Sequence, residues 1–110
     1  MVLLPLLGSR NKERILVYLL SRGEGYAREM ARFYTTGLAP LQNQLERLEA
    51  GGVLVSRNVG RTRQYELNPR YPLLKELTAL LEKALAFYSA EDRAQLVMNR
   101  RRPRRAGKPL

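Results

Sequence analysis

The chain has 110 residues, which is enough for one domain with a modest hydrophobic core. It carries 20 Lys and Arg against 10 Asp and Glu, and this net charge of +10 points to a polyanionic partner, most often nucleic acid, or alternatively to a surface charged for solubility. The absence of Cys and His excludes disulfides, thiol-based redox sensing, and zinc, copper or iron sites built on thiolate or imidazole.

The apolar run Val2–Leu7 near the start of the chain is too short for the core of a signal peptide and contains Pro5. No apolar run approaches membrane-spanning length. We therefore expect a cytoplasmic protein with no membrane partner.

Hydrophobic spacing predicts two helices in the first third of the chain. Ser9 is placed to cap the first helix, and Gly23 permits the left-handed exit near its end. Its buried stripe comprises Ile15, Leu16, Leu19 and Leu20. The second helix covers about residues 27–34 and is ended by the breaker cluster 35–37.

A third helix is predicted from Ala39 or Pro40 to Ala50, because proline is tolerated only in a first turn and two glycines follow Ala50. Its inward face carries Leu38, Leu41, Leu45 and Leu48. The short breaker between the second and third helices makes the pair a helix-turn-helix candidate.

The outer face of the third helix offers amides and a guanidinium, the groups that pair with base edges in a major groove. The candidate DNA-binding residues on and beside it are Thr36, Ala39, Pro40, Gln42, Asn43 and Arg47. The alternative is an ordinary solvated face, since Asn and Gln are common on helix surfaces.

A β-hairpin is predicted next, with a turn at residues 58–60 and an alternating second strand at 63–67. Arg57, Arg61 and Arg63 bracket the turn with no acid between them, which favours contact with DNA phosphates or a narrow minor groove. These arginines also suit the protection of an exposed β edge.

A long helix is predicted from Pro72 to about Tyr88, and its leucine stripe is too wide for one seam. An exposed apolar stripe marks an interface, so we expect a homodimer; the alternative is that a last short helix, about residues 90–98, folds back over the stripe. The expected dimer residues are Leu74, Leu77, Leu81, Leu85 and Tyr88.

The last segment, residues 99–110, holds six basic residues and no acid, which leaves the rest of the chain at +4. We expect this tail to be disordered when free. The expected organisation is a winged helix-turn-helix domain over 1–70, a helical dimerisation segment over 71–98 and the tail over 99–110.

Several stretches, in this order and spacing, resemble winged helix-turn-helix regulators of the ArsR-like kind over about residues 6–86. They are residues 7–10 with 14–16, residues 26–31, and residues 45–54 followed by 60–61 and 65–69. The resemblance implies homodimeric, sequence-specific DNA binding, with Gln42 and Asn43 at base-contacting positions and Arg61 and Arg63 near the backbone. A metal response is not implied, because the chain has no Cys or His.

Some similar winged-helix domains lie beside nucleotidyltransferases, but that chemistry needs paired carboxylates, and Asp92 is the only Asp here. We therefore expect no enzyme activity, no catalytic residue, no cofactor and no metal. The expected fold is mainly α with a small β-hairpin wing, a winged helix-turn-helix with a C-terminal dimerisation helix. The expected function is a DNA-binding transcriptional regulator, with a repressor favoured; the alternatives are a protein-interaction module and a non-specific nucleic-acid-binding protein.

Overall fold

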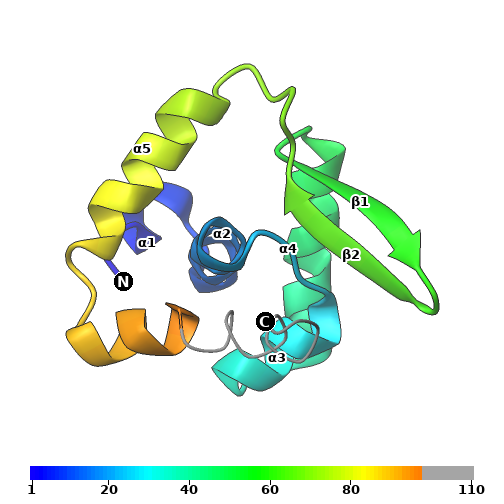
Figure 1. The fold of residues 1–110 in the computed structure, drawn as a ribbon, viewed down its shortest axis with the longest axis horizontal. Helices are drawn as coiled ribbons and strands as arrows, with labels where there is room; N and C mark the ends of the chain where they lie inside the picture. The colour runs from blue at the N-terminus through cyan, green and yellow to red at the C-terminus, as the bar shows by residue number, and fades with distance from the viewer. Residues whose placement is uncertain (98–110) are drawn as a thin grey trace, which may run out of the picture.

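The computed structural model describes residues 1–97, and these form a mainly helical fold with one antiparallel β-hairpin (Figure 1). The elements in chain order are α1 (Leu4–Leu7), α2 (Arg10–Arg22), α3 (Ala27–Tyr34), α4 (Leu38–Ala50), β1 (Leu54–Val59), β2 (Thr62–Leu67) and α5 (Leu74–Leu85). Residues 90–97 are also helical. The predicted fold class is thereby confirmed, whereas the role of α5 in dimerisation stays a prediction.

Helix α2 is the centre of the molecule, and Figure 1 shows it end-on between α5 and α4. The Ser9 hydroxyl accepts a hydrogen bond from the backbone N–H of Lys12 at 3.1 Å, as a capping residue does. Gly23 ends the helix at φ 89° and ψ -46°, a positive φ that glycine accommodates but not the predicted left-handed helical conformation. Ile15 and Val17 are fully buried, and α2 contacts α1, α3, α4, α5 and β2.

The turn between α3 and α4 is tight. Thr35 takes φ 50°, and it is the one non-glycine residue with positive φ in the described chain. The N–H of Thr36 bonds to the carbonyl of Ala31 at 3.0 Å, which closes the end of α3. Helix α4 begins at Leu38, slightly before the predicted start, and Pro40 still lies in its first turn, where a missing N–H does no harm.

The wing is a two-stranded hairpin in which Val59 pairs with Thr62, so that Gly60 and Arg61 form the turn. Gly60 takes φ 61°, which suits a tight hairpin turn. The turn therefore lies later than the predicted 58–60, because Asn58 is still paired in the strand, opposite Arg63.

A bridge fixes the base of the wing to the core. The backbones of Gly25 and Tyr65 exchange two hydrogen bonds, at 3.1 and 2.8 Å. A Cβ on Gly25 would lie 2.7 Å from the ring of Tyr18, so only glycine allows this approach. The wing is thus held in a fixed position relative to α2.

The C-terminal helices pack back onto α2. Helix α5 is shorter than the predicted 72–88, and two of its own side chains, Leu81 and Ala84, are buried. Ser89 caps the helix at 90–97 by accepting from the N–H of Asp92 at 3.0 Å, and Leu96 of that helix is buried. The last short helix therefore covers part of the core within one chain. The predicted tail at 99–110 lies outside the described residues.

Candidate nucleic-acid interface

Helix α4 separates cleanly into a buried face and an exposed face. Leu41 and Leu45 are fully buried and Leu48 is nearly so, which fixes the rotation of the helix against α2 and α3. The residues predicted to face DNA are exposed on the other side: Ala39, Pro40, Gln42, Asn43 and Arg47. Thr36, in the turn before the helix, is half-buried.

A narrow strip on this exposed face runs along α4 with helical 3–4 spacing. It consists of Ala39, Asn43, Glu46 and Ala50, all of them exposed. The small residues at its two ends would let the helix approach a groove closely. The polar residues at its centre are the groups nearest to anything that binds there.

The three wing arginines are exposed, but their surroundings differ. The Arg57 guanidinium pairs with Glu24 at 2.8 Å, and the two side chains are 60% and 49% exposed. Such a surface pair contributes little to stability, so Arg57 can exchange Glu24 for a phosphate. Arg61 stands at the turn and has no hydrogen bond or ion pair within residues 1–97.

Arg63 is held by a relay across the wing. Its Nη1 donates to the hydroxyl of Ser56 at 2.7 Å, and that hydroxyl donates to Oε2 of Glu49 at 2.6 Å. The relay joins β2, β1 and the end of α4. Arg63 therefore combines a structural role with its exposed position, whereas Arg61 is the freer of the two.

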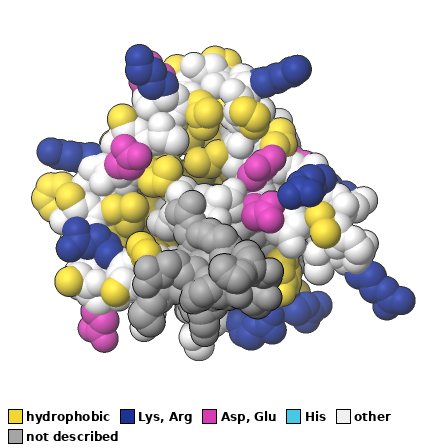
Figure 2. Space-filling view, in the orientation of Figure 1, with side chains coloured by type: hydrophobic (Ala, Val, Ile, Leu, Met, Phe, Trp, Pro, Cys, Tyr) yellow, Lys and Arg dark blue, Asp and Glu magenta, His cyan; other side chains and the backbone are white. Residues whose placement is uncertain are grey.

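A hollow of about 250 Å³ separates α4 from the wing. Gln42 and Glu46 line it from α4, Arg61 and Arg63 from the wing, and Arg28 from the start of α3. In the orientation of Figure 1, Lys and Arg side chains project from the edge where the wing lies (Figure 2). Of the predicted residues, the structure brings Gln42, Arg61 and Arg63 together at this hollow, whereas Asn43, Arg47 and Arg57 do not line it.

Sequence reasoning did not select Arg28 and Arg32, two exposed side chains one turn apart on α3. Both border a shallow hollow at the turn, together with Thr35 and Thr36. In helix-turn-helix proteins that bind DNA, the first helix of the motif crosses the phosphate backbone. The i, i+4 spacing of two arginines beside the breaker cluster was the available signal.

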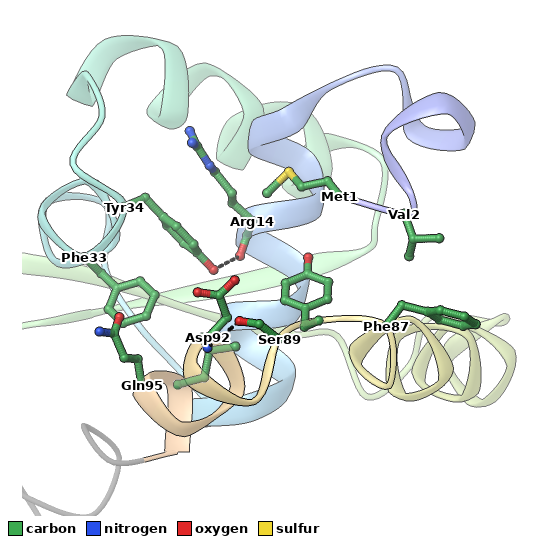
Figure 3. A pocket seen from close by; sticks show the side chains of 11 residues that line it. Met1, Val2, Arg14, Phe33, Tyr34, Phe87, Ser89, Asp92 and Gln95 are labelled. Atoms are coloured by element: carbon green, nitrogen blue, oxygen red, sulfur yellow. Dashed lines mark hydrogen bonds between the residues drawn. The ribbon is translucent and has the colours of Figure 1, made fainter.

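A second cavity, of about 390 Å³, lies away from this surface, between the N-terminus, α2, α3 and the start of the last helix (Figure 3). Beside it the Tyr34 hydroxyl donates to the backbone carbonyl of Arg14 at 2.8 Å. Burial raises the pKa of Tyr34 above its ordinary value. The exposed Phe87 stands at the rim, apart from the Tyr34 ring.

A buried carboxylate links the two ends of the described chain near this cavity. Glu13 is fully buried; its Oε1 accepts from the N–H of Leu3 at 3.0 Å and its Oε2 from the hydroxyl of Tyr88 at 2.7 Å. Burial, and then the hydrogen bond to Glu13, raise the pKa of Tyr88. Glu13 therefore joins the N-terminal segment to the end of α5.

Arg22 holds the last helix in a similar way. Its guanidinium lies 4.6 Å from the ring centroids of Tyr18 and Phe33, and it donates to the carbonyls of Leu96 and Gln95 at 3.0 and 3.2 Å. Cations near a helix C-terminus are favoured by its dipole.

The residues predicted to form a dimer lie deeper than expected. Leu81 has no exposed surface and belongs to the hydrophobic core, and Leu74, Leu77, Leu85 and Tyr88 are half-buried. The role of these five residues in a dimer stays a prediction. The exposed side of this segment instead carries Leu73, Leu80 and Phe87, which are 56%, 39% and 69% exposed.

Within residues 1–97, no cluster of three or more His, Cys, Asp or Glu could hold a metal ion. None of the helices in this range is long and apolar enough to cross a membrane.

Solved structures resemble this fold over most of its length. The YusO protein of Bacillus subtilis matches with a TM-score of 0.56 and 16% identity, over 90% of this chain and 76% of that one. The chain has a winged-helix fold. ZitR of Lactococcus lactis matches with a TM-score of 0.54 and 15% identity, over 90% of this chain and 83% of that one.

The adhesin competence repressor AdcR of Streptococcus pyogenes matches this winged helix with a TM-score of 0.53 and 17% identity, over 89% of this chain and 84% of that one. No protein-family model matches the chain, and no curated protein matches it in sequence. At these identities the likeness establishes the fold, and the function is argued from the surface described above.

Proposed function

We propose that this winged helix is a sequence-specific, double-stranded DNA-binding transcriptional regulator that acts as a homodimer, as a repressor. The observation that carries the proposal is the exposed amide-bearing face of α4, flanked by wing arginines on one surface of a basic chain. A structural neighbour is itself named a repressor. The sequence resemblance to ArsR-like regulators supports the same function, without a metal response.

The proposed roles follow from where each group lies. Asn43 and Gln42 would contact base edges, because amides pair with adenine in the major groove. Arg61 and Arg57 would contact phosphates, since a free or loosely paired guanidinium on a projecting hairpin reaches the backbone. Arg28 would add a phosphate contact from α3.

Selection of bound sequences from random duplex DNA tests this function. The wild-type protein should enrich one sequence, and Asn43→Ala should lose preference at one or two of its positions. Gln95→Ala is the matched control, because that exposed amide lies on the last helix rather than on α4. Enrichment of no sequence by the folded wild-type protein would contradict the proposal and favour a protein-interaction module or non-specific binding.

The homodimer is proposed to form through the exposed edge of the α5 segment. Leu80 is exposed on α5, and the exposed Leu73 and Phe87 lie just before and just after this helix, so the α5 segment carries three large exposed apolar side chains. A dimer with two-fold symmetry matches a palindromic DNA site, which has the same symmetry. In this organisation residues 1–70 bind DNA, 71–98 dimerise and 99–110 are a basic tail.

Light scattering at micromolar concentration tests the dimer. The wild-type protein should have twice the chain mass, and Leu80→Glu should give a folded monomer because it places a charge on the exposed edge. Val59→Glu, a similarly exposed apolar residue on the wing, is the control and should stay dimeric. A monomeric wild-type protein would contradict this part of the proposal.

A further inference from the structure

Glu46 is an exposed carboxylate at the centre of the basic recognition surface. It lies on the strip that also carries Asn43, three residues earlier, and it lines the hollow between α4 and the wing. A negative charge there would repel a phosphate backbone. If this face binds DNA, the Glu46 carboxylate must contact something other than a phosphate.

Three other glutamates of the helix-turn-helix and its flanking loop already have partners. Glu24 pairs with Arg57, Glu29 accepts from the N–H of Tyr26 at 3.4 Å, and Glu49 accepts from the hydroxyl of Ser56. Glu46 has no hydrogen bond or ion pair within the described part of the chain. Its acceptor capacity is therefore available to a ligand.

None of the three arginines that line the hollow, Arg28, Arg61 and Arg63, forms an ion pair with Glu46. Arg63 lines the same hollow, but its guanidinium donates to Ser56 instead. Arg61 also borders the hollow and forms no ion pair with Glu46. The carboxylate thus remains a free acceptor between the helix and the wing.

Base chemistry limits what such an acceptor can recognise. In the major groove the hydrogen-bond donors are the N4 amino group of cytosine and the N6 amino group of adenine. Adenine places the N7 acceptor beside its amino group, which repels a carboxylate, whereas cytosine has no acceptor on that edge. A carboxylate therefore favours cytosine.

We propose that Glu46 is a specificity-determining residue that selects a cytosine by accepting a hydrogen bond from its N4 amino group. The inference rests on the proposed function. Three residues of α-helix advance about 4.5 Å, close to one base-pair step of about 3.4 Å. The cytosine therefore lies within one or two base pairs of the position that Asn43 specifies.

Selection from random duplex DNA with variants of Glu46 tests the assignment. The wild-type protein should select a C·G pair at one position, and Glu46→Gln should relax or change that position alone. Glu82→Gln removes an equally exposed carboxylate from α5 and should select the wild-type sequence. Circular dichroism confirms that each variant is folded.

A chemical probe tests the contact without changing the protein. In a duplex with N4-methylcytosine at the selected position, the methyl group replaces the amino hydrogen that faces the major groove. Wild-type affinity should fall about tenfold, the low end of the effect of losing a base contact. Glu46→Ala should bind the methylated and unmethylated duplexes equally.

The outcomes separate this inference from the proposed function. If the wild-type protein selects no sequence, both fail. If it selects a sequence and Glu46→Gln selects the same one, binding every duplex more tightly, Glu46 is only a repulsive charge and the inference alone is overturned. Equal wild-type affinity for the methylated duplex overturns it as well.

Discussion

Replacing Tyr88 with Phe removes one hydroxyl and tests the link between the N-terminal segment and the turn after α5. That hydroxyl donates to Oε2 of the fully buried Glu13 at 2.7 Å. A hydrogen bond to a charged group is worth about 1.5–3 kcal/mol, and Tyr88 is half-buried, so water replaces part of the loss. We expect the free energy of unfolding to fall by about 2 kcal/mol.

Urea denaturation followed by circular dichroism measures this loss, and a double-mutant cycle with Glu13→Gln assigns it to the pair. The coupling energy between the two positions should exceed about 0.5 kcal/mol. Tyr71→Phe is the control, because the Tyr71 hydroxyl has no partner within residues 1–97, and it should change stability by less than about 0.5 kcal/mol. A Tyr88→Phe protein as stable as wild type would refute the reasoning.

Three other changes have defined outcomes. Arg61→Ala should weaken binding to cognate and random duplexes about equally, and it should reduce the slope of log affinity against log salt by about one. Fluorescence anisotropy across a salt series measures both effects. A loss of affinity at the cognate site alone would contradict the phosphate role of Arg61. Leu81→Ala should lower the free energy of unfolding by about 2–5 kcal/mol in urea, because it empties a fully buried site; a stable variant that only dissociates would contradict its place in the core. Deleting 99–110 should flatten the salt dependence while keeping the selected sequence, and superimposable salt slopes would show that the tail does not touch DNA.

Stability should also fall at alkaline pH. Burial raises the pKa of Tyr18 and Tyr34 above the ordinary value of 10.0, so the folded state keeps both hydroxyls protonated. Their contribution is fully present below pH 10 and is lost as the pH rises above it, where the unfolded chain ionises first. Urea titrations between pH 8 and 12 should show this decline, and a constant free energy of unfolding would contradict it.

Local signals in the sequence predicted α2, α3 and α4 within a residue or two, whereas α1 was not predicted and α5 is shorter than predicted. Ser9 and Gly23 mark the two ends of α2. A capping hydroxyl and a glycine with positive φ end a helix through contacts with residues next to them in the chain, so the sequence alone reveals them. Pro40 predicted the position at which α4 begins to within two residues, because proline is tolerated only in the first turn of a helix. The outer face of α4 followed from helical periodicity once its leucines were assigned to the core.

Features that depend on distant contacts could not be predicted in this way. Periodicity showed that the α5 segment is apolar, but it did not show that α2 covers Leu81 while Leu80 stays exposed. Glu13 lies in the first turn of α2, and its partners lie 10 and 75 residues away in the chain. Glu46 could not be singled out from the sequence, because the partners of Glu24 and Glu49 lie on the wing and are known only from the structure.

The ratio of dissociation constants for the selected duplex and for random duplex, at physiological salt, tests the central claim most directly. A regulator that reads bases through α4 should bind its selected site at least about 10³-fold more tightly. Replacing Gln42 and Asn43 together with Ala should reduce that ratio toward one while leaving random-duplex affinity unchanged. Equal affinity of the wild-type protein for both duplexes would contradict sequence-specific DNA binding.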